Sequence, residues 1–381
     1  MSSTSIDLER LRAVAQTHIE PIVELTARIG AVAAPTGQEF ERARFVAALW
    51  QERGYTPEID SVGNVYVLRG GKNKKAPLLM LMAHTDTVFP VSTPLIIKRE
   101  GDTLHGPGIS DNSVSVATML HTFDLLDELK IETATDVVAV ANVGEEGLGN
   151  LLGARTAVER YRPDLGAVIV IDGGLGHITY GAVGSKRWRI TVHGPGGHSY
   201  GSFGTPSAIH GLGRIIAALA GLQVPQSPKT TFNVGVIEGG TSVNTIAASA
   251  SALLDMRSTD VESLNWLAEE ARALIEQRAG AGLSVEINVL GERPAGERSL
   301  SDPLIQLAGE VLQWLCIEPR YGSSSTDANI PISLNIPSVC IGVTHGEHAH
   351  TLQEFFHIPP LGPGLAQIGR ICVEASEMLV K

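Results

Sequence analysis

The sequence predicts an α/β protein in which a second domain is inserted into a mostly parallel sheet. The chain has 381 residues, which is long for one domain. Apolar strand-like runs alternate with helical stretches up to about residue 184, as in a parallel sheet built from βαβ units. This rhythm changes between residues 185 and 294 and then returns. We therefore predict one domain from residues 1–184 and 295–381, with an inserted domain from residues 185–294.

The first domain is expected to contain three apolar strands. They read PLLMLMAHTD (77–86), DVVAVANVGEE (136–146) and GAVIVID (166–172), and a later run, IPSVCIGV (336–343), is expected to rejoin the sheet. SVSVATMLHTFDLLDEL (113–129) and LIQLAGEVLQWL (304–315) are helical stretches. Thr36 followed by Glu39 is a capping-box pattern, which predicts the start of a helix that runs to Trp50.

The inserted domain has a different order of elements. KRWRITVHG (186–194) alternates like a half-buried strand, and a helical stretch, SAIHGLGRIIAALAGL (207–222), follows it. Two strands, a strongly amphipathic helix at VESLNWLAEEARALIEQ (261–277) and a last strand come next. The order βαββαβ is that of a ferredoxin-like domain.

Composition excludes several classes of protein. The formal net charge is −12, which argues against nucleic-acid binding, since that requires a basic patch. Three cysteines cannot form an even disulfide framework and fit a reducing compartment. No run approaches the ~18 apolar residues of a membrane span, and the N-terminus MSSTSIDLERL lacks the features of a signal peptide. We therefore expect a cytoplasmic protein with no membrane association.

Acidic and histidine side chains follow each of the three apolar strands. His84 and Asp86 end the first, Glu145 and Glu146 the second, and Asp172 the third. In an open parallel sheet, ligands bind beyond the carboxyl ends of the strands. Carboxylates and imidazoles gathered there suit a metal, and the pattern favours a two-metal hydrolase.

Each of these residues also has a simpler interpretation when taken alone. His84 suits zinc, with Asp86 fixing the imidazole tautomer, but an isolated pair of this kind is more often a surface feature. Glu145 and Glu146 repel each other, so a buried pair needs a cation or a shared proton. One could then bind metal while the other acts as general base, although two adjacent glutamates are usually a solvated turn.

The remaining candidates lie in loops. Asp111 could bridge two metals or cap the helix that follows it. Asp172 could be an ordinary turn former. The segment THGEHAHTLQEF contains His345, His348 and His350, and their spacing alone does not show which of them binds metal. His198, in a glycine-rich loop, could polarise a carbonyl group or be a polar loop residue.

Six motifs together resemble one family. MLMAHTDTV, GPGISDN, VGEEGLG, VIDGG, GPGGHS and HAHTLQEF occur in this order and look like the M20 family of co-catalytic zinc metallopeptidases and amidohydrolases. The family includes aminotripeptidases, carboxypeptidases and deacylases such as acetylornithine deacetylase and succinyl-diaminopimelate desuccinylase. The resemblance covers nearly the whole chain. It implies a zinc-hydrolase catalytic domain with an inserted ferredoxin-like lid.

The resemblance also implies roles for individual residues. It implies two Zn²⁺ ions per chain, for which Co²⁺ or Mn²⁺ could substitute. One ion would be held by His84 and Asp172, the other by Glu146 and His350, with Asp111 bridging them. Glu145 matches the general base, Asp86 orients His84, and His198 stabilises the oxyanion. Asn244 and Arg257 match lid residues that grip the substrate, often its carboxylate.

One departure from the family pattern is visible after the bridging aspartate. Asn112-Ser113-Val114 stands where Asp-Lys-Gly or a close relative is usual, and this removes one negative charge. The family places a cis peptide bond just after this aspartate, and we expect Asn112 to tolerate it.

The function expected is hydrolysis of an amide bond in a small substrate that bears a carboxylate, most simply a peptide. An N-acyl-amino-acid deacylase is the alternative, and a catalytically silent binding homologue is a further one. A serine hydrolase is excluded because GISDN is not a GxSxG elbow. Two chain crossings, near Ser185 and Pro294, are typical of a hinge, so we expect the lid to close on the substrate and to form a homodimer.

Overall fold

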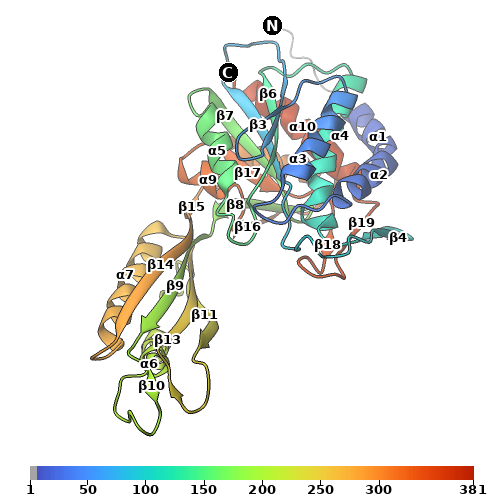
Figure 1. Ribbon diagram of the computed structural model, residues 1–381. Coiled ribbons are helices and arrows are strands. Elements are labelled where there is room, and N and C mark those ends of the chain that lie inside the picture. The colour runs from blue at the N-terminus through green and yellow to red at the C-terminus, as the bar shows by residue number, and fades with distance from the viewer. Residues whose placement is uncertain (1–6) are drawn as a thin grey trace. The chain divides into compact units, whose positions relative to one another are not determined.

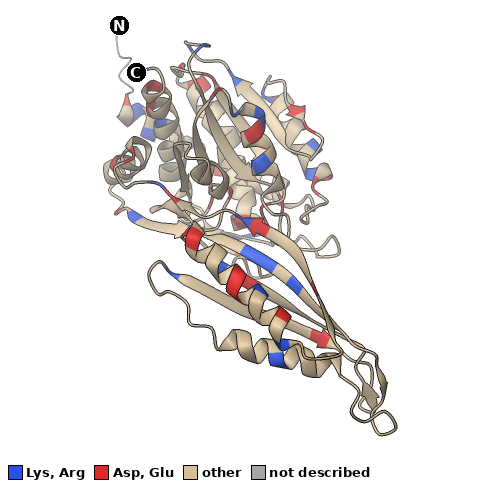
Figure 2. Ribbon diagram, turned by 90° about the vertical axis from the view of Figure 1, so that its left-hand side faces the viewer, with Lys and Arg blue, Asp and Glu red and all other residues tan. Residues whose placement is uncertain are grey.

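The computed structural model describes residues 7–381 and divides into two compact units. Unit 1 comprises Met1–Gly181 and Arg298–Lys381, and unit 2 comprises Ala182–Glu297. The expectation that MSSTSIDLERL is not a signal peptide falls partly on residues 1–6, which lie outside the described residues. Basic and acidic residues are interspersed along the ribbon of the described chain (Figure 2).

Unit 1 is built on a large mixed sheet whose centre is parallel (Figure 1). The strand order is β1-β2-β6-β3-β7-β17-β8-β15, and β16 pairs with β8. Strands β6, β3, β7 and β17 run parallel to one another. The bounds are β1 (Glu58–Ile59), β2 (Val65–Arg69), β3 (Leu78–His84), β6 (Val137–Asn142), β7 (Leu165–Ile171), β8 (His177–Ala182), β15 (Gly296–Glu297), β16 (Arg320–Ser324) and β17 (Ser338–Ile341).

Helices cover both faces of this sheet. Leu79 and Leu81 of β3 belong to the main apolar cluster, while Met80 and Met82 point to the opposite face and are also fully buried. Helices α4 and α10 pack together against β3, and α5 packs on β6 (Figure 1). The bounds are α1 (Leu8–Thr17), α2 (Ile19–Gly30), α3 (Phe40–Glu52), α4 (Val114–Glu128), α5 (Leu152–Tyr161), α8 (Pro303–Trp314), α9 (Asn329–Ser333) and α10 (Leu361–Met378).

The capping box predicted before α3 is wrong. The helix begins at Phe40, and its N-cap residue Glu39 makes no side-chain capping bond. The hydroxyl of Thr36 instead donates to Asp86 at 2.9 Å, and Glu39 accepts from the backbone N–H of Gly37 at 2.8 Å. The hydroxyl of Thr36, which the capping pattern assigned to the start of α3, therefore donates to the buried carboxylate of Asp86 instead.

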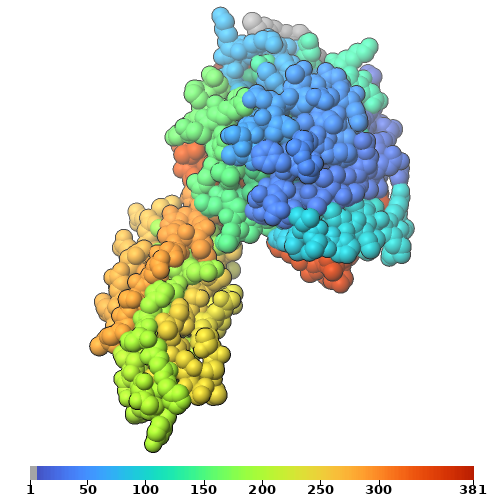
Figure 3. Space-filling model, viewed as in Figure 1, coloured from blue at the N-terminus to red at the C-terminus, as the bar shows by residue number. Residues whose placement is uncertain are grey.

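A second, small sheet brings together two segments that are far apart in the sequence. Its order is β18-β19-β5-β4, with β4 (Lys98–Glu100), β5 (Thr103–His105), β18 (Gly346–Glu347) and β19 (Phe355–His357). In the space-filling view, residues near 100 (cyan) lie beside the red C-terminal part of the chain (Figure 3). This sheet supports the loop that carries His350.

Unit 2 has the βαββαβ order predicted from the sequence. Its main sheet has the order β11-β13-β9-β14, with antiparallel neighbours throughout. Buried residues alternate along β13, because one face packs against α6 and α7. The bounds are β9 (Gly184–His193), β10 (Gly197–His198), α6 (Ala208–Ala220), β11 (Thr230–Gly239), β12 (Thr245–Ile246), β13 (Ser249–Ser258), α7 (Val261–Arg278) and β14 (Ser284–Arg293).

Candidate metal centre

The predicted strand ends meet at one edge of the unit 1 sheet. Strand β3 is parallel to both β6 and β7, and His84 is in register with Asn142, the last residue of β6. Glu145 and Glu146 follow β6, and Asp172 follows β7. The parallel arrangement therefore gathers these polar side chains at the carboxyl edge.

His84 is almost fully buried, with 1% of its surface exposed. Its Nε2 lies 3.1 Å from Oδ1 of Asp111, and its Nδ1 lies 3.2 Å from the backbone oxygen of Asp86 and 3.4 Å from Oδ1 of that residue. An Nδ1–H donated to Asp86 leaves Nε2 as the lone-pair nitrogen that faces Asp111. The ring is therefore oriented to offer Nε2 to a metal.

Asp86 is fully buried and links the first strand end to the second. Besides its contact with His84, its carboxylate accepts the backbone N–H of Glu145 at 3.0 Å and that of Glu146 at 2.8 Å. These bonds hold the two glutamates in place relative to the imidazole. Arg42, also buried, donates to the backbone oxygen of Thr85 at 2.7 Å and so fixes the turn between His84 and Asp86.

Asp111 lies in the segment Ile109–Ser113 that leads into α4, at a kink where the backbone of Asp111 and Asn112 is not helical. It does not cap this helix: the N-cap residue is Ser113, which makes no side-chain capping bond. The Asp111–Asn112 peptide bond is cis, as the resemblance implied. Asn112 is buried and donates its amide to the backbone oxygen of Ile171 at 2.9 Å, so it ties this turn to the end of β7.

Glu354 holds the turn that carries Asp111. Its carboxylate accepts backbone N–H groups from Gly108 at 3.1 Å, Ser110 at 2.7 Å and Asp111 at 2.9 Å. Burial raises the pKa of Glu354 to about 7, although these backbone hydrogen bonds oppose the shift. Sequence reasoning missed this residue, because its partners lie more than 240 positions away.

His350 is the histidine of its loop that reaches the cluster. Its Nε2 lies 3.1 Å from Oδ2 of Asp111 and 2.8 Å from Oε1 of Glu146. Its backbone is left-handed, with φ of 67°. By contrast, His348 lies near the ring of Phe355, at 5.9 Å between centroids, and the remaining histidine, His345, is near His177 and Arg320.

The side chains form three groups whose ligand atoms lie within 4.8 Å of one another. Two of the groups share Asp111: one adds His84 and Asp172, and the other adds Glu146 and His350. The third consists of His84, Glu145 and Glu146. Imidazole nitrogens and carboxylate oxygens in this number are the donors that zinc, manganese and cobalt accept.

Negative charge accumulates in this cluster. Burial, and next the charge of Asp111, raise the pKa of both Asp172 and Glu146. Burial also opposes ionisation of Asp111, but hydrogen bonds from His350 and His84 outweigh it and lower the pKa of that carboxyl. A hydrogen bond to Asp111 is the main cause that raises the pKa of His350 to about 9. Carboxylates packed this closely favour a bound cation, so the residues present fit a metal.

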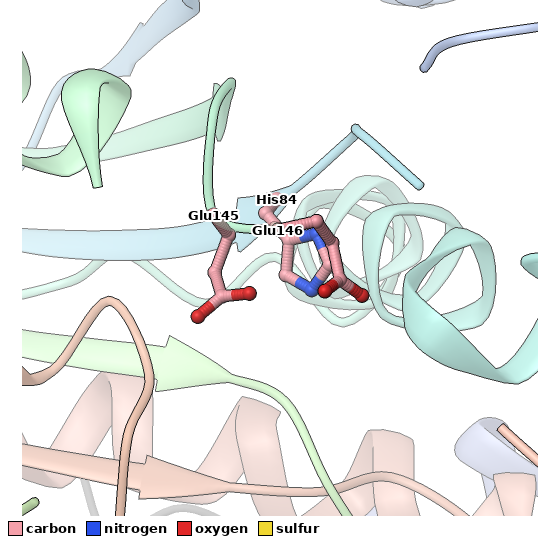
Figure 4. A group of neighbouring side chains, drawn as sticks. All are labelled: His84, Glu145 and Glu146. Carbon is pink, nitrogen blue, oxygen red and sulfur yellow. The ribbon is translucent and has the colours of Figure 1, made fainter. Parts of the chain in front are cut away.

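The two adjacent glutamates point in different directions. Figure 4 shows that the carboxylates of Glu145 and Glu146 diverge from neighbouring positions on the loop, with His84 beside them. Both residues are 6% exposed. Only Glu146 is in the group with His350 and Asp111. Glu145 therefore has a carboxylate at the cluster but outside both of the groups that share Asp111.

A second buried carboxylate, Asp327, lies close to the cluster and was also missed. Its Oδ2 accepts from the side-chain amide of Asn142 at 2.7 Å, and the residue is fully buried. Burial raises its pKa to about 7, with smaller opposing effects from His84 and Asn142. Asn142 ends β6 beside His84, so its hydrogen bond to Asp327 helps to hold this strand end in place.

In unit 2, His198 lies in the two-stranded sheet formed by β10 and β12, whereas Arg257 lies in β13 of the main sheet. His198 pairs with Thr245 across β10 and β12, and the backbone oxygen of Asn244 accepts from Ser199, so these two candidates are neighbours. Arg257 is near the C-terminal end of β13, where its Nε donates to Asp255 at 2.8 Å. Eight positions of extended chain separate Arg257 from Ser249, which corresponds to roughly 27 Å.

Family models match both units. A peptidase dimerisation domain of the M20 type matches residues 180–282, and peptidase family M28 matches residues 64–175. A peptidase M20 domain-containing protein of Schizosaccharomyces pombe is 31% identical over 247 residues, which are 61% of this chain and 60% of that protein. A putative succinyl-diaminopimelate desuccinylase of Mycobacterium tuberculosis is 28% identical over 87% of this chain and 92% of its own length.

Solved structures have the same fold. A tripeptidase from Staphylococcus aureus superposes with a TM-score of 0.81 at 21% identity, over 94% of this chain and 99% of the other. At this identity the likeness shows the fold alone. Together with the sequence matches, it confirms the resemblance and the predicted fold class. Within residues 7–381, no helix has the length and apolar character that crossing a membrane requires.

Proposed function

We propose that this chain, an amide-bond hydrolase of the M20 peptidase and amidohydrolase type, uses two divalent metal ions held by unit 1. His84 and Asp172 would hold one ion, Glu146 and His350 the other, and Asp111 would bridge them. Zinc is the ion we expect, with cobalt or manganese as substitutes, because every proposed donor is a nitrogen or oxygen.

The single observation that carries this proposal is the position of Asp111. It belongs to two ligand groups at once, and its two oxygens face different histidines: Oδ1 faces His84 and Oδ2 faces His350, each at 3.1 Å. A carboxylate with its oxygens divided in this way suits a bridge between two ions ~3.5–4 Å apart.

The bound ions would polarise the scissile carbonyl and promote ionisation of the attacking water. The chain itself supplies the proton transfer. Glu145 is outside both groups that share Asp111, so we assign it as the general base that takes a proton from the water and passes it to the leaving amine. Asp86 would keep His84 in the required tautomer. Its hydrogen bonds to the backbone N–H groups of Glu145 and Glu146 would fix the positions of the proposed base and the proposed ligand relative to each other.

We propose a small peptide with a free carboxylate as the substrate. An aminopeptidase, a tripeptidase and a dipeptidase are among the proteins with this fold. An N-acyl-amino-acid substrate is the alternative, favoured by the relatives named succinyl-diaminopimelate desuccinylase, which align with 87% or more of this chain. We also propose a cytoplasmic location, because Cys316, Cys340 and Cys372 are all free thiols.

We further propose that His198, Asn244 and Arg257 act on the substrate and that the chain is a homodimer through unit 2. Support comes from the match of residues 180–282 to a peptidase dimerisation domain. Arg257 and His198 are too far apart in one chain to contact the same small substrate. Contribution of His198 and Asn244 by a partner chain removes this difficulty. His198→Ala should then lower turnover by about 10²–10³ with metal content unchanged, as for loss of an oxyanion donor.

One experiment tests the function and chooses between the substrate classes. The protein is freed of metal by chelation, its metal content is measured, and dipeptides, tripeptides and N-acyl amino acids are assayed before and after Zn²⁺, Co²⁺ or Mn²⁺ is added. We expect no hydrolysis without metal, recovery with metal, and peptides as the better substrates. Full activity in a verified metal-free sample would overturn the metal proposal, and preference for N-acyl amino acids would replace the peptidase assignment.

A further inference from the structure

A cluster of three cationic or titratable side chains lies beside the metal centre and takes no part in it. We call His177, Arg320 and His345 the basic cluster. His177 begins β8, Arg320 begins β16, and His345 follows β17. All three side chains are exposed, and all three belong to unit 1.

The basic cluster is at the same edge of the sheet as the metal ligands. Strand β8 runs antiparallel to β17, so its first residue lies beside the carboxyl end of β17. The N–H of Arg320 donates to the backbone oxygen of Gly176 at 2.8 Å, and Gly174 forms a bridge with Thr344, the neighbour of His345. Three connections therefore tie the cluster to the short turn that leaves Asp172.

The turn between Asp172 and the basic cluster is open. A Cβ atom on Gly173 would have nothing within 4 Å. A Cβ on Gly174 would lie 3.2 Å from Nδ1 of His177, and one on Gly176 would lie 3.9 Å from Nη2 of Arg320. The imidazole and the guanidinium thus lie over a glycine turn that starts at a proposed metal ligand, and among residues 7–381 no atom would come within 4 Å of a Cβ on Gly173.

Within the described part of the chain, no acidic side chain neutralises the charge of Arg320. Among residues 7–381, its guanidinium makes no hydrogen bond or ion pair with an acidic side chain. Burial, and next the charge of Arg320, lower the pKa of His177. The same two causes lower the pKa of His345, with smaller contributions in the same direction from His357 and His177. The positive charge of Arg320 would therefore attract an anion, and no acidic side chain within residues 7–381 supplies one to the basic cluster.

We propose that the basic cluster binds a carboxylate of the substrate, with Arg320 as the principal contact and His177 and His345 as additional donors. A guanidinium offers a carboxylate two parallel N–H groups, and neutral imidazoles add one N–H each. Unit 1 then has its own anion site on the Asp172 side of the metal centre, besides Arg257 of unit 2. This inference rests on the proposed function, because it assumes that the nearby reaction is amide hydrolysis.

The test compares a substrate acid with its own amide. For the best peptide or N-acyl amino acid found, kcat/KM is measured for the free carboxylate and for the primary carboxamide. The wild-type protein should prefer the acid. Arg320→Gln should lower kcat/KM for the acid by about 10- to 100-fold, mainly through KM, which corresponds to loss of a hydrogen bond to a charged group. Hydrolysis of the amide and metal content should stay within twofold, and Arg320→Lys should restore part of the preference.

A matched control is Arg162→Gln. Arg162 is an exposed arginine that pairs with Glu159 at 3.3 Å and precedes β7, so it lies at the opposite edge of the sheet. This change should leave both substrates unaffected. The inference is wrong if the wild type hydrolyses acid and amide equally well, or if Arg320→Gln lowers both to the same extent. Absence of hydrolysis of every amide-bond substrate by the metal-loaded wild type would instead overturn the proposed function.

Discussion

His84 and His350 both direct Nε2 at the carboxylate of Asp111, at 3.1 Å in each case, but on very different supports. His84 ends a buried strand and its side chain is 1% exposed. His350 is in a loop with left-handed backbone, and its side chain is 51% exposed. The position of His84 is fixed by its contact with Asp86 and by hydrogen bonds of Arg42 and Asp327 to neighbouring residues. The comparison indicates a rigid, buried half and an accessible half that share one carboxylate.

This difference follows from where each half is built. A strand end in the middle of a parallel sheet is fixed by ladder hydrogen bonds and by packing on both faces. A loop residue depends on the small sheet formed by β18, β19, β5 and β4. We therefore expect changes in the His84 half to affect stability and metal binding together, and changes in the His350 half to affect mainly metal binding and access.

The largest expected effect is a difference between substitutions of Glu145 and Glu146, the adjacent glutamates on the loop that follows β6. Glu145→Gln keeps the size of the side chain but removes the proposed general base, so kcat should fall by about 10²–10⁴ with metal still bound. Glu146→Gln alters a proposed metal ligand of the His350 half and should therefore lower metal content. Steady-state kinetics with elemental analysis checks both. Loss of metal from Glu145→Gln alone would reverse the two assignments.

The next effect compares the histidines directly in the metal-free protein. His84→Ala leaves the carboxylates of Asp86 and Asp111 without their buried cationic partner, which should cost about 3 kcal/mol of unfolding free energy. His350→Ala removes a half-exposed contact and should cost less than about 1 kcal/mol. Urea denaturation measures both. Equal losses would contradict the division into a rigid and an accessible half.

A smaller effect is expected for Asp86→Asn, which sharpens the account of the buried half. The amide keeps the shape but weakens the contact that fixes the tautomer of His84. Metal affinity or activity should fall by about 10- to 100-fold, as for other residues that orient a metal ligand. The matched control is Asp124→Asn, which alters a partly buried carboxylate bonded to Arg53. That variant should bind metal normally.

The smallest effect concerns pH and Asp327. Burial raises its folded pKa to about 7 from an ordinary value of 3.8. The folded state therefore binds this proton more tightly than the unfolded chain, so the contribution of Asp327 to stability is full below about 3.8 and is lost as the pH rises through 7. Between pH 6 and 8, the metal-free wild type should lose roughly 1–2 kcal/mol more than Asp327→Asn. Parallel pH profiles of the two proteins would contradict this.

The two halves also differ in how far the sequence predicts them. His84 and Asp172 follow apolar runs that form neighbouring parallel strands, so alternating strands and helices were enough to expect their convergence. Nothing local distinguished His350 from His345 and His348, because the choice depends on a loop conformation. The same limit applies to Glu354 and Asp327, whose partners lie far away in the sequence. Thr36 shows the converse, since a local capping pattern was overridden by a distant buried carboxylate.

The central claim is that Asp111 is shared by two metal ions, and a zinc titration tests it most directly. Metal-free wild-type protein and His350→Ala are titrated with Zn²⁺ by calorimetry, and the bound metal is counted after dialysis. The account predicts two ions per chain in the wild type and one, held by the His84 half, in His350→Ala. A fully active wild-type protein that holds one ion per chain, or a His350→Ala variant that still holds two, would contradict it.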